Sequence, residues 1–278
     1  MHLTADGQGR TQLLANFLAA ATGFYRQATM GLLPAITCRG RASWHWRDDH
    51  LMILSIHVPK AAGNSFREAL MSRFGERILR DYGDWAGFDE PTANLRRMLR
   101  TEAMRTRRDE LHQNYDVIHG HFIADKYLGL FPVEDFVAFF RDPYQQVLAH
   151  YHFLRRNPQR EHPEVKVFHD AKMSIMEYIE WDAFRNYQSQ FLGSLSVDDL
   201  AFVGLSAQYA QSLEQFKAVF GYDLGEERFE NVNTEMQNGE YHVDTDVRAA
   251  IGKYRGADLE LYARAQETFK RQTAAVAT

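Results

Sequence analysis

The stretch "LMILSIHVPKAAGNSFREAL" (residues 51–70) decides the fold, because its character changes in the middle. Residues 51–58 are apolar and β-prone, which predicts a buried strand, and a helix is expected after the small-residue loop that follows Pro59. A helix that begins at the carboxyl end of a strand offers unpaired backbone amides and the positive end of its dipole. The stretch therefore predicts a seat for an anion.

The residues of this loop suit a phosphate group. Ala61 and Ala62 keep side-chain bulk away, Asn64 and Ser65 add short polar groups, and Lys60 adds a point charge. The lysine precedes the glycine of the loop, so the pattern is not the G-x-x-x-x-G-K-[ST] loop of nucleotide kinases. A plain strand-to-helix turn with an incidental lysine stays open as the alternative.

The composition is that of an ordinary globular protein. The 278 residues, of which 45% are hydrophobic and 25% charged, are enough for one large domain. The net charge of −5 argues against a surface devoted to nucleic acid. The single cysteine, Cys38, rules out an internal disulfide framework and a multi-cysteine metal site. We therefore expect a cytoplasmic protein without a nucleic-acid partner, of open oligomeric state.

Residues 1–50 are expected to form an N-terminal helical extension, and residues 51–278 the main domain. The apolar run of residues 13–25 is too short to span a membrane. A core-packing or amphipathic helix is favoured over a cleavable signal peptide. Contact of this helix with a membrane surface stays open.

Strand and helix patterns alternate along the rest of the chain. Further strand-length apolar runs are residues 116–122, 135–140 and 200–205, and helical segments are residues 94–115, 141–156, 206–222 and 247–272. Ser206 is a candidate helix cap, and Gly256 is a weak point in the last segment. The alternation predicts a single α/β domain with a central, mostly parallel sheet flanked by helices. Ligands of such folds bind at the carboxyl ends of the strands, where the loop at Lys60 lies.

Three segments together resemble the carbohydrate-type sulfotransferases, the broad family that includes the heparan sulfate 2-O-sulfotransferases. These segments are "IHVPKAAGNSFREAL" (56–70), "VIHGHF" (117–122) and "FFRDPYQQVLAHYHF" (139–153). Blocks such as "NYQSQFLG" (186–193) and "DLELYARA" (258–265) follow in the order of the family. The resemblance covers most of residues 51–270.

The resemblance implies that a sulfuryl group passes from 3′-phosphoadenosine 5′-phosphosulfate (PAPS) to a hydroxyl of a carbohydrate or glycolipid, without a metal. It implies a P-loop-like strand–loop–helix for the 5′-phosphosulfate and an arginine for the 3′-phosphate. Where the family has a serine as second ligand of that phosphate, this chain has Ala149, which leaves the strength of the contact open. The positions implied to bind PAPS are Lys60, Ala61, Ala62, Gly63, Asn64, Ser65 and Arg141.

Lys60 and His121 are the candidate catalytic residues. Sulfuryl transfer resembles phosphoryl transfer, in which charge grows on the leaving oxygen, and Lys60 would stabilise that charge. In 2-O-sulfotransferase-like members the second histidine of a similar His-Gly-His looks to be the base, which carries over to His121, with His119 as its neighbour or orienter. An imidazole suits the role because it titrates near neutral pH. A metal half-site or a structural pair of histidines is the alternative.

Several other polar residues keep two interpretations. Arg141 has a salt bridge with Asp142 as its alternative role. The amides Asn186 and Gln188 either bind an acceptor by hydrogen bonds or are polar residues of a helix surface. Asn231 and Asn233 either order a loop over the cofactor or make a turn. Two arginine groups are solvated surface or receive an anionic acceptor: Arg96, Arg97, Arg100, Arg105, Arg107 and Arg108, and Arg155, Arg156 and Arg160.

Two other functions compete with sulfuryl transfer. A P-loop-type nucleotide kinase or phosphotransferase would share the anion-binding loop, but it would need a Walker lysine and an acidic pair for Mg²⁺. A non-catalytic nucleotide-binding protein of the same fold is favoured by one residue, Ala149.

Overall fold

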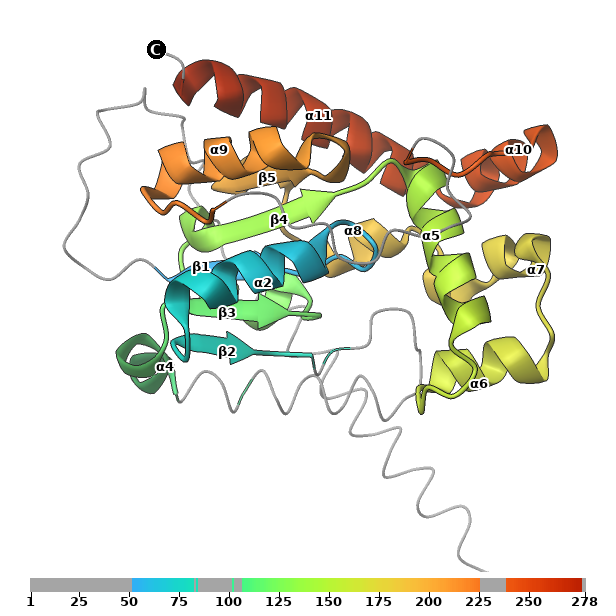
Figure 1. Ribbon diagram of the computed structural model, residues 1–278, viewed down its shortest axis with the longest axis horizontal. Helices are drawn as coiled ribbons and strands as arrows, with labels where there is room; N and C mark the ends of the chain where they lie inside the picture. Colours follow the sequence, from blue (N-terminus) through green and yellow to red (C-terminus); the bar gives the residue numbers. More distant parts are fainter. Residues whose placement is uncertain (1–51, 83, 85–101, 103–106, 226–238, 277–278) are drawn as a thin grey trace, which may run out of the picture. The chain divides into compact units, whose positions relative to one another are not determined.

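The computed structural model describes residues 52–82, 84, 102, 107–225 and 239–276, which belong to the compact unit Arg47–Thr278 (Figure 1). Several predictions lie outside the described residues and stay predictions. They concern the helical extension of residues 1–50, Cys38, Arg96, Arg97, Arg100, Arg105, Asn231 and Asn233.

A five-stranded sheet lies at the centre, with the strand order β2-β3-β1-β4-β5. Every pair of neighbouring strands is parallel, which confirms the predicted α/β fold with helices around a parallel sheet. The edge strand β2 was not predicted, because its three residues are too few to show an apolar run. The strands are β1 (Ile53–Ile56), β2 (Ile78–Arg80), β3 (Val117–Gly120), β4 (Phe136–Phe140) and β5 (Phe202–Leu205).

The helices fill the connections between the strands. The α-helices are α2 (Gly63–Phe74), α4 (Arg108–Asn114), α5 (Pro143–Arg156), α6 (Pro163–Asp170), α7 (Ile175–Glu180), α8 (Tyr187–Leu192), α9 (Tyr209–Phe220), α10 (Thr245–Tyr254) and α11 (Gly256–Val276). Short 3₁₀ turns are η1 (Ala124–Lys126), η2 (Val133–Asp135), η3 (Asp182–Phe184), η4 (Val197–Asp199) and η5 (Ser206–Gln208). Among the described helices, none combines the length and apolar character that a membrane span needs.

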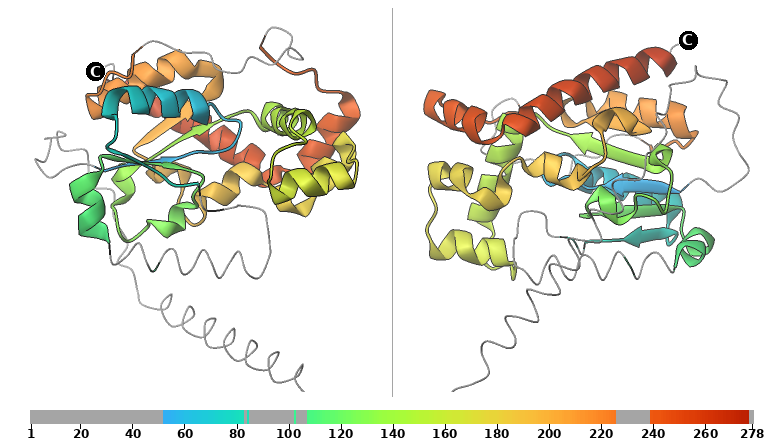
Figure 2. Two further views of the ribbon diagram at one scale, coloured as in Figure 1. Left: turned by 60° about the horizontal axis from the view of Figure 1, so that its bottom comes forward. Right: turned by 180° about the vertical axis from the view of Figure 1, so that it is seen from behind.

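The two faces of the sheet are covered by different helices, as Figure 2 shows from two sides. Successive side chains of a strand point to opposite faces, so each strand contributes to two apolar layers. On one face Phe139 packs in a cluster with Phe66 of α2 and Phe216 of α9. On the other face Phe140 belongs to a cluster that includes side chains of α8 and Phe269 of α11.

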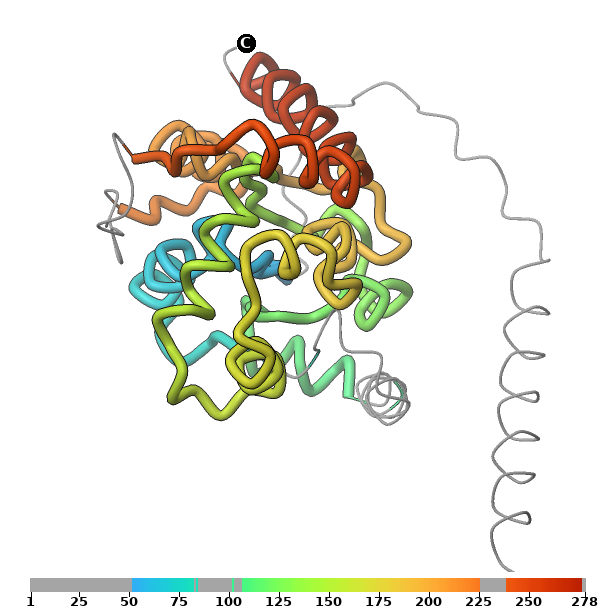
Figure 3. The backbone as a smooth tube through the Cα atoms, turned by 90° about the vertical axis from the view of Figure 1, so that its right-hand side faces the viewer, coloured from blue at the N-terminus to red at the C-terminus, as the bar shows by residue number. Residues whose placement is uncertain are grey.

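A third apolar cluster joins α5, α6, α7 and α10. These helices lie beyond the carboxyl ends of the strands, on the right in Figure 1 and in the foreground of Figure 3. Leu154 of α5, Phe168 of α6 and Ile251 of α10 are buried in it. The cluster gives the carboxyl edge of the sheet a helical wall, so the loops that leave β1, β3 and β4 face protein on one side.

The helix ends partly follow the predictions. The Asp142 side chain caps α5 by accepting from the Gln145 amide at 3.1 Å, and Pro143 occupies the first turn as expected. The predicted break at Gly256 is confirmed, because α10 ends before it and α11 begins there. The predicted cap at Ser206 is wrong: Ser206 begins a 3₁₀ turn, and α9 starts three residues later.

Candidate functional site

The loop after β1 turns sharply into α2. Lys60 and Ala62 both adopt positive φ angles, 64° and 68°, a conformation that non-glycine residues rarely take. Ala62 is the N-cap of α2 and makes no side-chain capping bond. The first amides of a helix have no partner inside it. Those of α2 therefore point to the loop as hydrogen-bond donors, as an anion seat requires.

Gly63 is required by a neighbouring side chain. A Cβ atom at this position would lie 1.8 Å from Cδ2 of His57. The His57 ring, which is 6% exposed, therefore packs directly on the backbone where α2 begins. The sequence predicted Gly63 in the loop, but it did not predict that the ring of His57 packs against it.

Lys60 is a half-buried cation in cationic surroundings. Its Nζ lies 4.4 Å from the centroid of the Phe153 ring. Burial, the largest cause, and the charges of Arg141, Arg156 and Arg160 together lower the pKa of Lys60 to about 8. Among the described residues, no carboxylate lies within 4.0 Å of this ammonium group. Lys60 thus carries a positive charge at neutral pH that no acidic partner cancels.

Arg141 leaves the end of β4 and reaches the same loop. Its Nη1 donates to the Lys60 carbonyl at 3.3 Å. The Gln188 side chain holds its backbone on both sides, accepting from the Arg141 amide at 3.0 Å and donating to its carbonyl at 2.8 Å. The carboxylate of Asp142 is used to cap α5, and within the described part of the chain Arg141 forms no ion pair with it. Burial lowers the pKa of the Arg141 guanidinium.

His121 follows β3 and is held by a single short hydrogen bond. Its Nδ1 lies 2.6 Å from the backbone carbonyl of His57. A carbonyl only accepts, so Nδ1 carries the proton and the neutral ring keeps its lone pair on Nε2. Burial lowers the pKa of His121 to about 4, while the bond to the carbonyl opposes that effect. His121 is therefore neutral at pH 7, with a proton acceptor at Nε2.

His119 has a different role from the one expected of a partner to His121. It is fully buried in β3, and its Nδ1 lies 2.9 Å from the Ser55 hydroxyl of β1. Burial lowers the pKa of His119 to about 3. The group that orients His121 is the backbone carbonyl of His57. The ring centroids of His57 and His121 lie 4.3 Å apart. Within the described residues no cluster of three ligand-type side chains suits a metal.

The register of the sheet explains why His57 meets His121. Strands β1 and β3 pair with Ile56 opposite Gly120, so the residues that follow each strand are also neighbours. The contact of His57 with His121 could have been predicted only from this pairing, which requires knowing that the two strands are adjacent and parallel. Gly120 itself is required by the chain, because a Cβ there would lie 1.7 Å from the Asp81 carbonyl oxygen.

Asn186 and Gln188 both make hydrogen bonds to backbone groups of distant segments. Asn186 accepts from the Ala257 amide at 3.1 Å and so caps the start of α11. Gln188 is 1% exposed and brackets the backbone of Arg141. Gln188 is therefore a buried residue and not a polar residue of a helix surface, and it holds the backbone of a candidate site residue, Arg141.

Ala149 lies in α5 with its side chain in the apolar cluster of α5–α7 and α10, at 2% exposure. A serine hydroxyl in this cluster would need a hydrogen-bond partner, which an alanine does not. Nδ1 of the adjacent His150 lies 2.7 Å from the Tyr178 hydroxyl. Burial lowers the pKa of His150 to about 3.

The arginines of the two groups lie in different surroundings. Arg107 pairs with Glu110 at 2.6 Å on the surface, with both side chains about half exposed, which is the solvated arrangement. Arg155, Arg156 and Arg160 are exposed residues at the end of α5 and just after it. The Arg160 guanidinium lies 5.0 Å from the centroid of the same Phe153 ring that Lys60 contacts, so this group borders the candidate site.

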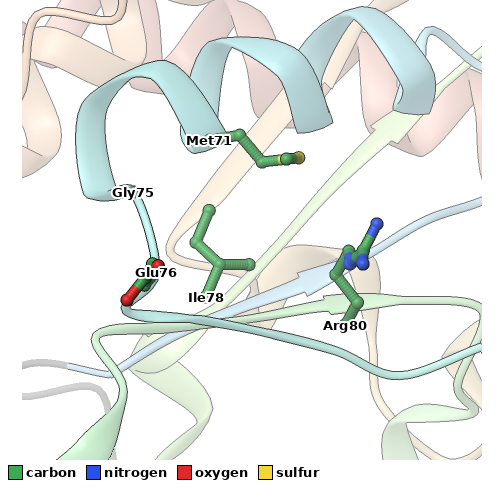
Figure 4. A pocket seen from close by; sticks show the side chains of 5 residues that line it. All are labelled: Met71, Gly75, Glu76, Ile78 and Arg80. Carbon is green, nitrogen blue, oxygen red and sulfur yellow. The ribbon is translucent and has the colours of Figure 1, made fainter.

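A pocket of about 290 Å³ lies elsewhere, between the end of α2 and the edge strand β2. Its walls come from Met71, Gly75, Glu76, Ile78 and Arg80, as Figure 4 shows. None of the residues predicted to bind PAPS lines it. The candidate site is therefore defined by convergent polar groups at the carboxyl edge of the sheet and not by this pocket.

Comparison of the chain with protein-family models, with curated proteins and with solved structures found no match.

Proposed function

We propose that this protein is a sulfotransferase that moves a sulfuryl group from PAPS to a hydroxyl of a carbohydrate or glycolipid. One observation carries the proposal. Three neighbouring strands, β3, β1 and β4, deliver a neutral imidazole, an anion-binding loop with a lysine, and an arginine to one edge of the sheet. The three groups are those that the sequence resemblance implies for base, 5′-phosphosulfate and 3′-phosphate.

The site fits the charge of PAPS. The open amides of α2, the ammonium of Lys60 and the guanidinium of Arg141 are donors, and no carboxylate of the described residues pairs with either cation. Anionic groups bind where backbone donors and cations converge in a partly buried place. Lys60 and Arg141 also contact each other through the Lys60 carbonyl, so both belong to one site.

The proposed reaction is a single displacement at sulfur. The acceptor oxygen forms a bond to sulfur while the bond between sulfur and the bridging oxygen of the 5′-phosphate breaks. Nε2 of His121 takes the proton of the acceptor hydroxyl. The bond pair of the breaking bond stays on the phosphate oxygen, where Lys60 and the amides of the loop balance the growing negative charge. The step changes no oxidation state, so it needs no oxidant or reductant.

Thermal denaturation with different nucleotides tests the donor site. We expect 3′-phosphoadenosine 5′-phosphate to raise the melting temperature, since a ligand that binds the folded state stabilises it, and we expect ATP with Mg²⁺ to have no comparable effect. Lys60→Ala and Arg141→Ala should lose the response. Lys166→Ala is the matched control, because Lys166 pairs with Asp170 on the exposed surface of α6.

The outcomes separate the competing functions. Stabilisation by ATP with Mg²⁺ alone would favour a phosphotransferase, and no response to either nucleotide would contradict the proposal. Stabilisation by 3′-phosphoadenosine 5′-phosphate without transfer of labelled sulfate to any glycan or glycolipid of a broad panel would favour a non-catalytic nucleotide-binding protein.

A further inference from the structure

Phe153 contacts two cations that belong to different parts of the site. Nζ of Lys60, from the loop after β1, lies 4.4 Å from the centroid of its ring. The Arg160 guanidinium, from the segment after α5, lies 5.0 Å from the same centroid. Phe153 itself is half-buried in α5, one turn before the end of that helix. Both distances are within the range of cation–π attraction.

The surroundings of Lys60 would otherwise drive its ammonium group away. Like charges repel, and burial removes the water that would screen them. The two nearby histidines are kept neutral, because burial lowers the pKa of both. The charged and titratable groups that face Lys60 are His57 before the loop, Arg141 after β4, His150 and Arg156 on α5, and Arg160 after α5. An attractive partner is therefore needed to keep the ammonium in place.

An aromatic ring is the partner best suited to an anion-binding site. A carboxylate would hold the lysine more strongly, but it would cancel the charge and repel an incoming phosphate or sulfate. The face of a ring attracts a cation through its quadrupole and carries no net charge. A lysine held on a ring therefore keeps its full charge for a ligand.

We infer that Phe153 is a positioning residue, whose ring holds the ammonium group of Lys60 beside the anion-binding loop by a cation–π contact and leaves its charge available to an anionic ligand. This inference rests on the proposed role of Lys60 in the donor site. Phe153 acts through Lys60.

The test compares Phe153→Leu with Phe153→Trp. Leucine keeps an apolar side chain over Lys60 but removes the π face, whereas tryptophan offers the strongest π face of the natural residues. With ¹³C-labelled lysine, the Cε signal of Lys60 is followed by NMR as a function of pH, and the signal is assigned by its loss in Lys60→Arg. Phe168→Leu is the control, because Phe168 is a buried ring of the same helical cluster.

We expect Phe153→Leu to lower the pKa of Lys60 by at least about 0.5, because the charged form loses its attraction while burial stays. Phe153→Trp should keep or raise that pKa, and Phe168→Leu should leave it unchanged. The dissociation constant of 3′-phosphoadenosine 5′-phosphate, measured by calorimetry, should rise about three- to tenfold in Phe153→Leu and stay within about twofold in Phe153→Trp.

An unchanged or raised Lys60 pKa in Phe153→Leu would overturn the inference, as would equal pKa values in the leucine and tryptophan variants. The NMR titration needs no ligand and no activity. If the unsubstituted protein fails to bind 3′-phosphoadenosine 5′-phosphate, the proposed function fails, while the titration still decides whether Phe153 holds Lys60.

Discussion

At the scale of single residues, the proposed reaction requires opposite protonation states of two side chains, His121 and Lys60. His121 must be neutral to accept a proton, and burial lowers its pKa to about 4. Lys60 must be charged to balance a leaving oxygen, and burial among cations lowers its pKa to about 8. Between these values both residues are in the required state.

The pH dependence of turnover follows from these two values. We expect kcat/KM for sulfuryl transfer to be level between about pH 5 and pH 7. It should fall as the pH drops through about 4, where His121 becomes protonated, and as the pH rises through about 8, where Lys60 loses its charge. Steady-state kinetics across this range provide the measurement.

Two variants assign the limbs of this profile. Lys60→Arg should move the alkaline limb upward, since a guanidinium stays charged, and His121→Gln should lower kcat by about 100-fold or more. His242→Gln is the control, because the side chain of His242 is 81% exposed and pairs only with Asp244 among the described residues. Turnover by His121→Gln at the unsubstituted rate would remove His121 from the role of base.

At the scale of elements, a chain of hydrogen bonds connects the last helix to the loop after β1. The Asp258 carboxylate of α11 accepts from the amides of Gln188 and Ser189 at 3.2 and 2.8 Å, which fixes the first turn of α8. Gln188 brackets the backbone of Arg141, and Arg141 donates to Lys60. The helix α8 therefore transmits the position of α11 to the end of β4.

Replacing Gln188 tests this connection. Gln188→Leu leaves the part-buried amide and carbonyl of Arg141 without the Gln188 side chain, so we expect the free energy of unfolding to fall by about 1–3 kcal/mol. The affinity for 3′-phosphoadenosine 5′-phosphate should fall as well, because Arg141 is no longer held. Urea denaturation and calorimetry measure the two effects.

A matched control lies on the same helix. Gln190 donates to the Arg185 carbonyl at 2.7 Å, away from Arg141, so Gln190→Leu should leave the affinity unchanged. Equal losses of affinity in both variants would show that α8 matters for folding alone.

The sequence predicts elements and residues to different extents. Strands β1, β3, β4 and β5 are predictable because each is a fully buried apolar run, and Lys60, Arg141 and His121 are predictable because each closely follows such a strand. The roles of Phe153 and Gln188 are not, since they depend on how α5 and α8 pack against loops distant in the chain. Local patterns contain no information on such contacts.

At the scale of the whole molecule, the two ends of the parallel strands carry different charged groups. Hydrogen-bond donors and cations lie at the carboxyl ends of the strands. At the amino edge, Asp135 precedes β4 and is 3% exposed. Burial, the largest cause, and the charge of Glu134 together raise the pKa of Asp135 to about 7. A group of this kind favours the folded state only while it is protonated.

Asp135 therefore makes stability depend on pH in a definite direction. Its pKa is higher in the folded chain than in the unfolded chain, so its contribution is favourable below the unfolded value of about 3.9 and is lost as the pH rises through about 7. We expect Asp135→Asn to raise the melting temperature at pH 8 by at least about 2 °C, with the gain disappearing near pH 4.

Calorimetry at several pH values checks this gain against two controls. Asp199→Asn replaces an exposed aspartate and should show no gain that depends on pH. The affinity of Asp135→Asn for 3′-phosphoadenosine 5′-phosphate should equal that of the unsubstituted protein, because Asp135 and the candidate site lie at opposite ends of β4. A gain of the same size at pH 4 and pH 8 would contradict the assignment to Asp135.

The contact between His57 and Gly63 links two positions in evolution. Since a Cβ at position 63 would lie 1.8 Å from the His57 ring, a side chain can be accommodated there only if the ring at position 57 is lost or turns away. The two positions therefore constrain each other. We expect them to vary together among relatives of this chain, and independent variation would contradict the constraint.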